Sequence, residues 1–231
     1  DMTSQMQVFE KNVTLTEQAL KILDQNTKEK KSLLSSFSGR RQIDPDELGV
    51  IADNSHEVIG VCSRISELNK QIVDNSAEQA RIKTALAQLE PWQGLDIPLN
   101  SGDTKTTAVF IGSLPQEYSD KLLAETIAEK SPKLEFEFEI EYSSPSMTCV
   151  AVLVPLSQKG EAENVLRGLG FARPMNPTSH TPKIKAQRLR DKSEQLKQSS
   201  EKAKQEIISY ADRRNDIRAT QDYFKIRTDK Y

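Results

Sequence analysis

The sequence predicts an α+β protein in which a small ferredoxin-like β-α-β-β-α-β lobe is carried on a long antiparallel helical coiled-coil stalk. Apolar residues recur at heptad spacing over both ends of the 231-residue chain, and this spacing changes to strict alternation in the middle. Hydrophobic residues make up 36% of the chain, charged residues 29%, and only nine residues are glycine. This composition is typical of helices that bury a narrow stripe.

Residues 1–90 are predicted to form two long coiled-coil helices, at about 3–38 and 45–90. The apolar lanes of the first helix are Met6, Val13, Leu20 and Leu34, and Phe9, Leu23 and Phe37. Asp44 and Pro45 then supply an N-cap and a proline at the first helical position. The lanes of the second helix are Ile51, Val58, Ile65, Ile72 and Leu86, and Val61, Leu68, Ile82 and Leu89. Asn75 and Gln79 interrupt these lanes, and such polar residues usually fix the register of a coiled coil.

Residues 91–180 are predicted to form the lobe, because the apolar period becomes two after Pro91. The expected strands are 106–111, 134–142, 147–156 and a short last one at 171–173, and the expected helices are 115–130 and 157–169. Residues 181–231 then predict a single returning helix that begins at Thr181-Pro182. Its apolar lane is Leu189, Leu196, Ala203, Tyr210, Ile217 and Phe224.

Catalytic and metal-binding patterns are not found in the sequence. His56 and His180 have no partner at metal-ligand or triad spacing, and no phosphate-binding glycine loop or nucleophile elbow occurs. Cys62 and Cys149 lie far apart in apolar runs, which favours two buried free thiols and a reducing compartment. We therefore expect no enzymatic activity, no metal and no cofactor. No apolar run is long enough to span a membrane.

The segment from Val109 to Pro115 resembles the first ribonucleoprotein motif of an RNA-recognition module, which shares the β-α-β-β-α-β order. Two observations weigh against RNA. The third strand of such a module should carry a basic residue, a glycine and aromatic residues, and Met147 to Val154 contains none of these. Between Trp92 and His180 there are seven basic and twelve acidic residues, so the net charge of −5 would repel a phosphate backbone.

One strand of the lobe alternates apolar and acidic residues, and its acidic face consists of Glu135, Glu137, Glu139 and Glu141. In the ferredoxin-like order this strand is at the edge of the sheet. One interpretation is that the charges prevent the edge from pairing with other sheets. The other interpretation is that they form a docking face for a basic partner helix. A metal site is disfavoured, because side chains two apart on a strand do not converge on one ion.

Two short motifs point to a known family. Pro91-Trp92 and Leu95-Asp96-Ile97 lie between the long helix and a strand that ends in Gly112-Ser113-Leu114-Pro115. The sequence resembles the cytoplasmic region of V-type ATPase subunit I, the counterpart of eukaryotic subunit a, at these motifs. Gly170-Phe171 and the helix after Thr181 also fit this family.

The resemblance implies a non-catalytic stator part on the cytoplasmic side of a membrane-bound rotary ATPase. Its implied partners are the peripheral-stalk heterodimer and the membrane-sector subunits, with no nucleic acid and no direct membrane insertion of this segment. The family's membrane half, with its essential arginine, has no counterpart here, so we expect the distal lobe and stalk helices of a longer subunit. The alternatives are a coiled-coil adaptor or chaperone with an α/β head, and an RNA-recognition module.

Overall fold

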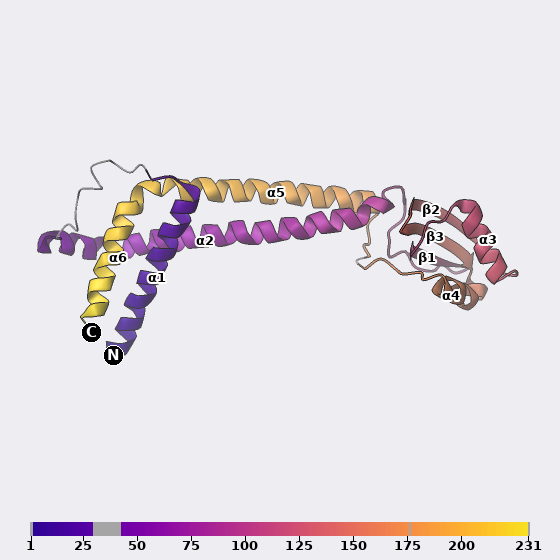
Figure 1. Ribbon diagram of the computed structural model, residues 1–231, viewed down its shortest axis with the longest axis horizontal. Coiled ribbons are helices and arrows are strands. Elements are labelled where there is room, and N and C mark those ends of the chain that lie inside the picture. The colour runs from indigo at the N-terminus through magenta and orange to yellow at the C-terminus, as the bar shows by residue number, and fades with distance from the viewer. Residues whose placement is uncertain (1, 30–42, 176, 231) are drawn as a thin grey trace. The chain divides into compact units, whose positions relative to one another are not determined.

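The structure, a computed structural model, describes residues 2–29, 43–175 and 177–230 and divides into two compact units. We call residues 1–79 and 194–231 the helical unit, and residues 80–193 the lobe unit. Helix α2 (Pro45–Leu89) and helix α5 (Pro182–Ser209) contribute residues to both (Figure 1). Long helices and a small three-stranded antiparallel sheet confirm the predicted α+β class.

The helical unit has a core to which four helices contribute. Helix α1 (Met2–Asn26) and helix α6 (Arg214–Asp229) join the parts of α2 and α5 that belong to this unit. The buried core residues are Ala19, Ile22, Leu23, Val58, Cys62, Ile65, Leu68, Ala203, Ile207 and Ile217. The heptad positions of α2 therefore supply the core as the sequence predicts, with Val58, Ile65 and Leu68 all buried.

Helices α1 and α6 lie side by side and antiparallel (Figure 1). Near one end of the pair the rings of Phe9 and Phe224 are 5.8 Å apart, and the Arg227 guanidinium lies 5.6 Å from the centre of the Phe9 ring. At the other end Arg214 contacts the C-terminus of α1. The apolar lane predicted for the returning helix thus continues on α6, but there it packs against α1.

The predicted end of the first helix is wrong. Helix α1 ends at Asn26 and not near residue 38, and the predicted lane residues Leu34 and Phe37 lie outside the described residues. Near this end the carbonyls of Ile22 and Leu23 accept additional hydrogen bonds from the side chains of Asn26 and Thr27.

The returning helix is also not continuous. It ends at Ser209, and the short 3₁₀ helix η4 (Ala211–Arg213) separates α5 from α6. The amide of Tyr210 donates to the carbonyl of Ile207, three residues back, at 3.0 Å. No proline or glycine marks this position. The break is held by tertiary contacts that Arg213 and Arg214 make with other helices.

The lobe unit contains an antiparallel sheet in the order β1-β3-β2, formed by β1 (Thr107–Leu114), β2 (Glu137–Ser144) and β3 (Met147–Pro155). Helix α3 (Asp120–Lys130) follows β1, and helix α4 (Lys159–Gly168) follows β3. This is the expected order of elements. Helix α3 begins five residues later than predicted because Ser119 is its N-cap, with the side chain accepting from the amide of Leu122.

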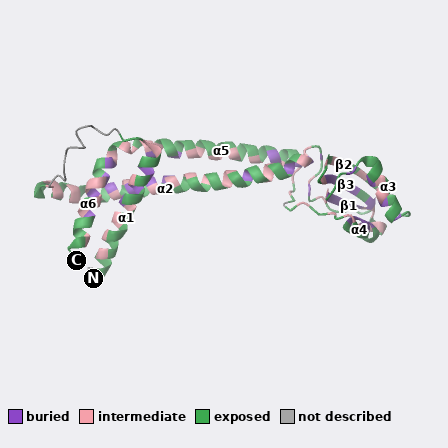
Figure 2. Cartoon of the chain, viewed as in Figure 1, coloured by how far each residue is buried: buried purple, intermediate pink, exposed green. Residues whose placement is uncertain are grey.

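Each face of the sheet covers a separate core. Figure 2 shows the buried residues of the strands in purple. The core shared with α3 and α4 buries Ala108, Phe110, Leu114, Leu123, Ile127, Val150, Val152, Val154, Ala162, Val165 and Leu166. On the opposite face a smaller core buries Leu89, Trp92, Leu95, Leu99, Val109, Ile111, Cys149 and Ala186. Neighbouring residues of β1 thus point to opposite cores, which is the alternation that the sequence shows.

The predicted fourth strand is reduced to a single bridge between Ala172 and Ser113. Pro174 follows closely and has no amide hydrogen to continue a ladder. The approach of this segment depends on Gly112, because a Cβ there would lie 2.3 Å from the Ala172 carbonyl oxygen. Gly170 turns the chain into the bridge with φ +79°, a conformation that glycine adopts without strain.

Candidate partner-binding site

The structure places three of the four predicted acidic residues, Glu137, Glu139 and Glu141, on the edge strand of the sheet. Strand β2 pairs only with β3, and Glu137 and Glu139 on it are exposed. Glu135 precedes the strand and is also exposed, and its backbone amide donates to Gln158 Oε1 at 2.8 Å. Glu137 and Glu139 pair with Leu153 and Ala151, so they share the sheet face that α3 and α4 leave open.

Glu141 differs from the other three glutamates. A bulge between Ile140 and Tyr142 shifts the register at this residue, and its side chain is half-buried. Its Oε1 atom is buried without a hydrogen-bond partner. Burial raises the pKa of Glu141, and the carboxylates of Glu139 and Asp96 raise it further. Of the four glutamates on the predicted acidic face, three are therefore exposed and the fourth is half-buried.

Asp96 joins this acidic surface, although no sequence pattern groups it with the strand. It lies in the loop after the 3₁₀ helix η2 (Glu90–Trp92), between the buried Leu95 and the exposed Ile97. The same loop approaches β2, because a Cβ on Gly94 would lie 3.1 Å from Glu141 Oε2. We call Glu135, Glu137, Glu139, Glu141 and Asp96 the acidic edge.

A buried hydrogen-bond network fixes the hairpin that carries the acidic edge. Thr148 on β3 is fully buried, and its hydroxyl donates to the Gln116 carbonyl at 2.7 Å and accepts from the Tyr118 amide at 2.9 Å. The Ser143 hydroxyl on β2 donates to the Tyr118 carbonyl at 3.1 Å. The β2–β3 hairpin is thus tied to the segment that leads into α3, so the edge is held on a rigid element.

The residues that suggested other chemistries do not form sites. His56 is exposed, and His180 Nε2 lies 2.8 Å from Arg188 Nη1. Phe110, the aromatic residue of the RNA-like motif, is 2% exposed in the core beneath α3 and α4, so it is not available to stack on a base. Across the described ranges, no group of three or more His, Cys, Asp or Glu residues is arranged to hold a metal ion. Cys62 and Cys149 are both buried free thiols, as predicted.

No described helix combines the length and the apolar composition of a membrane span.

The helical unit contains a second set of oriented polar groups, which join α2 to α5 and η4. Arg64 donates to both carboxylate oxygens of Glu206, at 2.6 and 2.9 Å. Arg213 makes the same kind of two-point contact with Glu57. These hydrogen bonds lower the pKa of Glu206 and of Glu57. Such planar two-point contacts are geometrically specific.

Asn75 forms a polar layer between α2 and α5, as its interruption of the heptad lane predicts. Its amide nitrogen lies 3.1 Å from Ser200 Oγ and 3.3 Å from Ser199 Oγ, and Gln71 donates to Ser199 Oγ at 2.7 Å. The layer satisfies its hydrogen bonds in only one alignment of the two helices. It therefore opposes sliding of one helix along the other.

Comparison with known proteins finds similar chains among solved structures. No family model and no curated protein matches the sequence. Among solved structures, the chain is similar to a crystal structure of the cytoplasmic N-terminal domain of subunit I, homolog of subunit a, of V-ATPase. The match covers 98% of this chain and 71% of that chain, with a TM-score of 0.55 and 16% sequence identity.

The two chains share a fold. At this identity the match shows the fold alone, and it agrees with the α+β architecture described above.

Proposed function

We propose that this chain is a non-catalytic stator element of a V-type rotary ATPase, which links the membrane sector to the peripheral stalks and resists torque during ion transport. The fold similarity to the cytoplasmic domain of subunit I over 98% of this chain is the observation that carries the proposal. The motifs around Trp92 and Gly112 support it from the sequence side. In this role the chain needs no cofactor and works on the cytoplasmic side of the membrane.

The contacts of the helical unit suit a part that bears load. A helix pair under torque must resist sliding, and apolar heptad contacts alone resist it weakly because neighbouring registers bury similar surface. Asn75 and the two-point Arg64–Glu206 contact each favour a single register. This favours a stiff stalk over a flexible linker.

The acidic edge is the surface that we assign to the partner. It presents the exposed Glu137 and Glu139 on an edge strand and the exposed Glu135 just before it, where a basic helix of a peripheral-stalk heterodimer would find complementary charge. The adjacent exposed apolar side chains Tyr142 and Leu153 would add contact area. If the charges instead serve only to keep the edge unpaired, no partner depends on them.

The stator role is tested by affinity purification of the tagged full-length chain from its own host cells under gentle detergent. We expect peripheral-stalk and membrane-sector subunits of the ATPase to co-purify. Recovery of the chain without any ATPase subunit, but with other proteins, would overturn the proposal and favour the coiled-coil adaptor.

The docking surface is tested separately with two variants of equal charge change. In the first variant Glu135, Glu137 and Glu139 are replaced by lysine. In the matched control Glu117, Glu125 and Glu129, which are exposed elsewhere on the lobe, are replaced by lysine. We expect the first variant to lose capture of the stalk subunits at least about tenfold while the control retains it. Equal capture by both variants would remove the edge from the interface and leave the stator proposal intact.

A further inference from the structure

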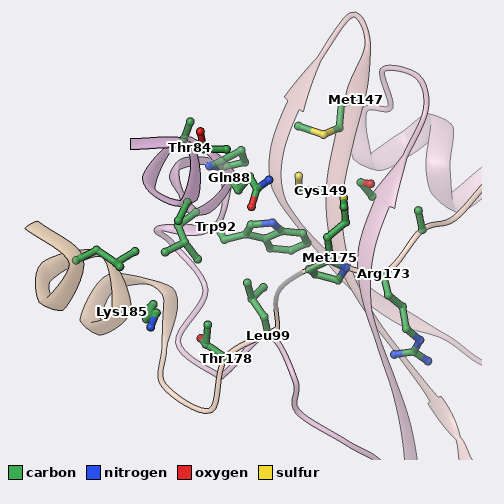
Figure 3. A pocket seen from close by; sticks show the side chains of 18 residues that line it. Thr84, Gln88, Trp92, Leu99, Met147, Cys149, Arg173, Met175, Thr178 and Lys185 are labelled. Carbon is green, nitrogen blue, oxygen red and sulfur yellow. The ribbon is translucent and has the colours of Figure 1, made fainter. Parts of the chain in front are cut away.

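An apolar cavity opens in the lobe unit on the side of the sheet opposite α3 and α4. It has a volume of about 610 Å³. Its wall includes Leu89, Trp92, Leu99, Met147, Cys149 and Met175 (Figure 3). Met175 is 87% exposed, although it is apolar. The volume lies within the range of about 300–1,000 Å³ that is usual for small-molecule sites.

The charges around the cavity have one sign. None of the residues that line it is acidic, although residues 92–180 carry a net charge of −5. The two lining cations are Arg173 and Lys185. The Arg173 guanidinium lies 5.7 Å from the centre of the Phe110 ring and points away from Trp92 (Figure 3). Lys185 is therefore the cation at the cavity, and within the described residues no ion pair neutralises it.

The positive charge continues along the start of α5. Between Pro182 and Ser193 the only acidic residue is Asp191, and the basic residues are Lys183, Lys185, Arg188, Arg190 and Lys192. A ligand that places an anionic group at this helix and an apolar part in the cavity would match both features.

We propose that the cavity binds a single-chain amphiphile with an anionic head group, with the chain against Trp92 and the head at Lys185. An alkyl chain requires no hydrogen bonds, whereas a peptide backbone would need polar partners that this wall largely lacks. Met147 and Met175 are flexible side chains that can adapt to a chain of variable length.

The ligand site can be tested directly because Trp92 is the only tryptophan in the sequence. Its fluorescence therefore reports on the cavity wall alone. Laurate is added to the full-length chain below its critical micelle concentration. We expect laurate to change the fluorescence of Trp92 in a saturable way. Dodecanol should bind more weakly than laurate, and dodecylamine should bind most weakly of the three. Over shorter carboxylates, affinity should rise by about fourfold per added methylene.

Two pairs of variants test where the anionic head group and the alkyl chain of the ligand bind. Lys185→Glu should weaken laurate binding by about tenfold, while the control Lys183→Glu, which does not line the cavity, should not. Ala87→Phe fills the cavity from an exposed position on α2 and should abolish binding, while Ala77→Phe, exposed in the helical unit, should leave it unchanged.

Several results would overturn the inference. These are the absence of a saturable change with laurate, equal affinity for laurate and dodecylamine, or binding that persists in Ala87→Phe. In a further experiment, anionic phospholipid vesicles are added in place of laurate. A response to vesicles without a response to laurate would indicate adsorption to a membrane surface and would exclude a single-chain site.

Discussion

The guanidinium of Arg214 at the start of α6 donates a hydrogen bond of 3.1 Å to the carbonyl oxygen of Leu23 near the end of α1. It also donates to the Thr27 carbonyl at 3.0 Å and lies 3.3 Å from Asp24 Oδ1. Arg214 is only 6% exposed. A buried cation therefore satisfies the last carbonyl groups of α1 and favourably opposes the negative end of that helix.

Arg214→Ala is expected to destabilise the helical unit by about 2 kcal/mol, because it removes a buried charged donor to the Thr27 carbonyl and one of the donors to the Leu23 carbonyl. Urea denaturation followed by helical circular dichroism measures this. The control is Arg218→Ala, since Arg218 pairs with Glu29 but its side chain is 42% exposed. The control should lose less than about 1 kcal/mol. Equal losses of stability in the two variants would show that the burial of Arg214 does not explain its contribution to the free energy of unfolding.

The second prediction concerns the polar layer at Asn75. Asn75→Leu should stabilise the α2–α5 pair by about 1 kcal/mol, because an apolar side chain suits a heptad position better. It should also weaken the preference for one register. Cysteines introduced at Gln71 and Ser199, which are in contact, should then form a disulfide in lower yield than in the Asn75 background. A higher melting temperature with undiminished cross-linking would show that Asn75 does not set the register.

Much of the fold could be predicted because it depends on periodicity. Heptad lanes identified α2, and alternation identified the strands and the two faces of the sheet. The break after Ser209 could not be predicted, since the lane of Tyr210, Ile217 and Phe224 continues unchanged while the packing partner changes to α1. Arg214 was missed for a related reason. An arginine in a mostly polar lane indicates solvent, and only the tertiary structure buries it.

The candidate site could be predicted in part. Alternation identified Glu137 and Glu139 as exposed on one face, and the ferredoxin-like order placed them at the edge. It could not reveal the bulge at Glu141, because a one-residue shift in pairing leaves no local signal in an alternating sequence. The apolar cavity was also missed, since its wall comes from segments that are far apart in the chain, from Thr84 to Leu189.

Gly112 gives a third prediction with a sharp control. Gly112→Ala should destabilise the lobe by more than about 2 kcal/mol, because its Cβ would lie 2.3 Å from the Ala172 carbonyl oxygen and 2.6 Å from the Phe171 ring. Gly160→Ala on α4 meets nothing within 4 Å and should be neutral or stabilising by up to about 1 kcal/mol. Thermal melts of the two variants measure the difference. If Gly112→Ala is as stable as Gly160→Ala, residues 171–173 do not pack against β1 as described.

The buried thiols predict a dependence of stability on pH. Burial raises the pKa of Cys62 and of Cys149 from 9.0 to about 11. Because the folded protein holds these protons more tightly than the unfolded chain, the stability that they contribute is complete below pH 9 and is lost as the pH rises towards 11. The urea midpoint should fall over this interval, and less steeply in Cys62→Ala. Identical slopes in both proteins would contradict a shifted pKa at Cys62.

The last prediction concerns Glu141, whose pKa is raised by burial and by the neighbouring carboxylates of Glu139 and Asp96. A carboxyl group with a raised pKa in the folded state favours folding when it is protonated, so this contribution is lost as the pH rises through that pKa. Glu141→Gln removes the charge and keeps the shape. It should therefore raise the melting temperature at pH 7 and change it little near pH 4.

Glu137→Gln is the control, because its side chain is exposed on the same strand and should shift the melting temperature little at either pH. If Glu141→Gln lowers the melting temperature at pH 7, then the charged form of Glu141 has a stabilising partner, and the acidic edge is not the repulsive surface that would favour a basic partner.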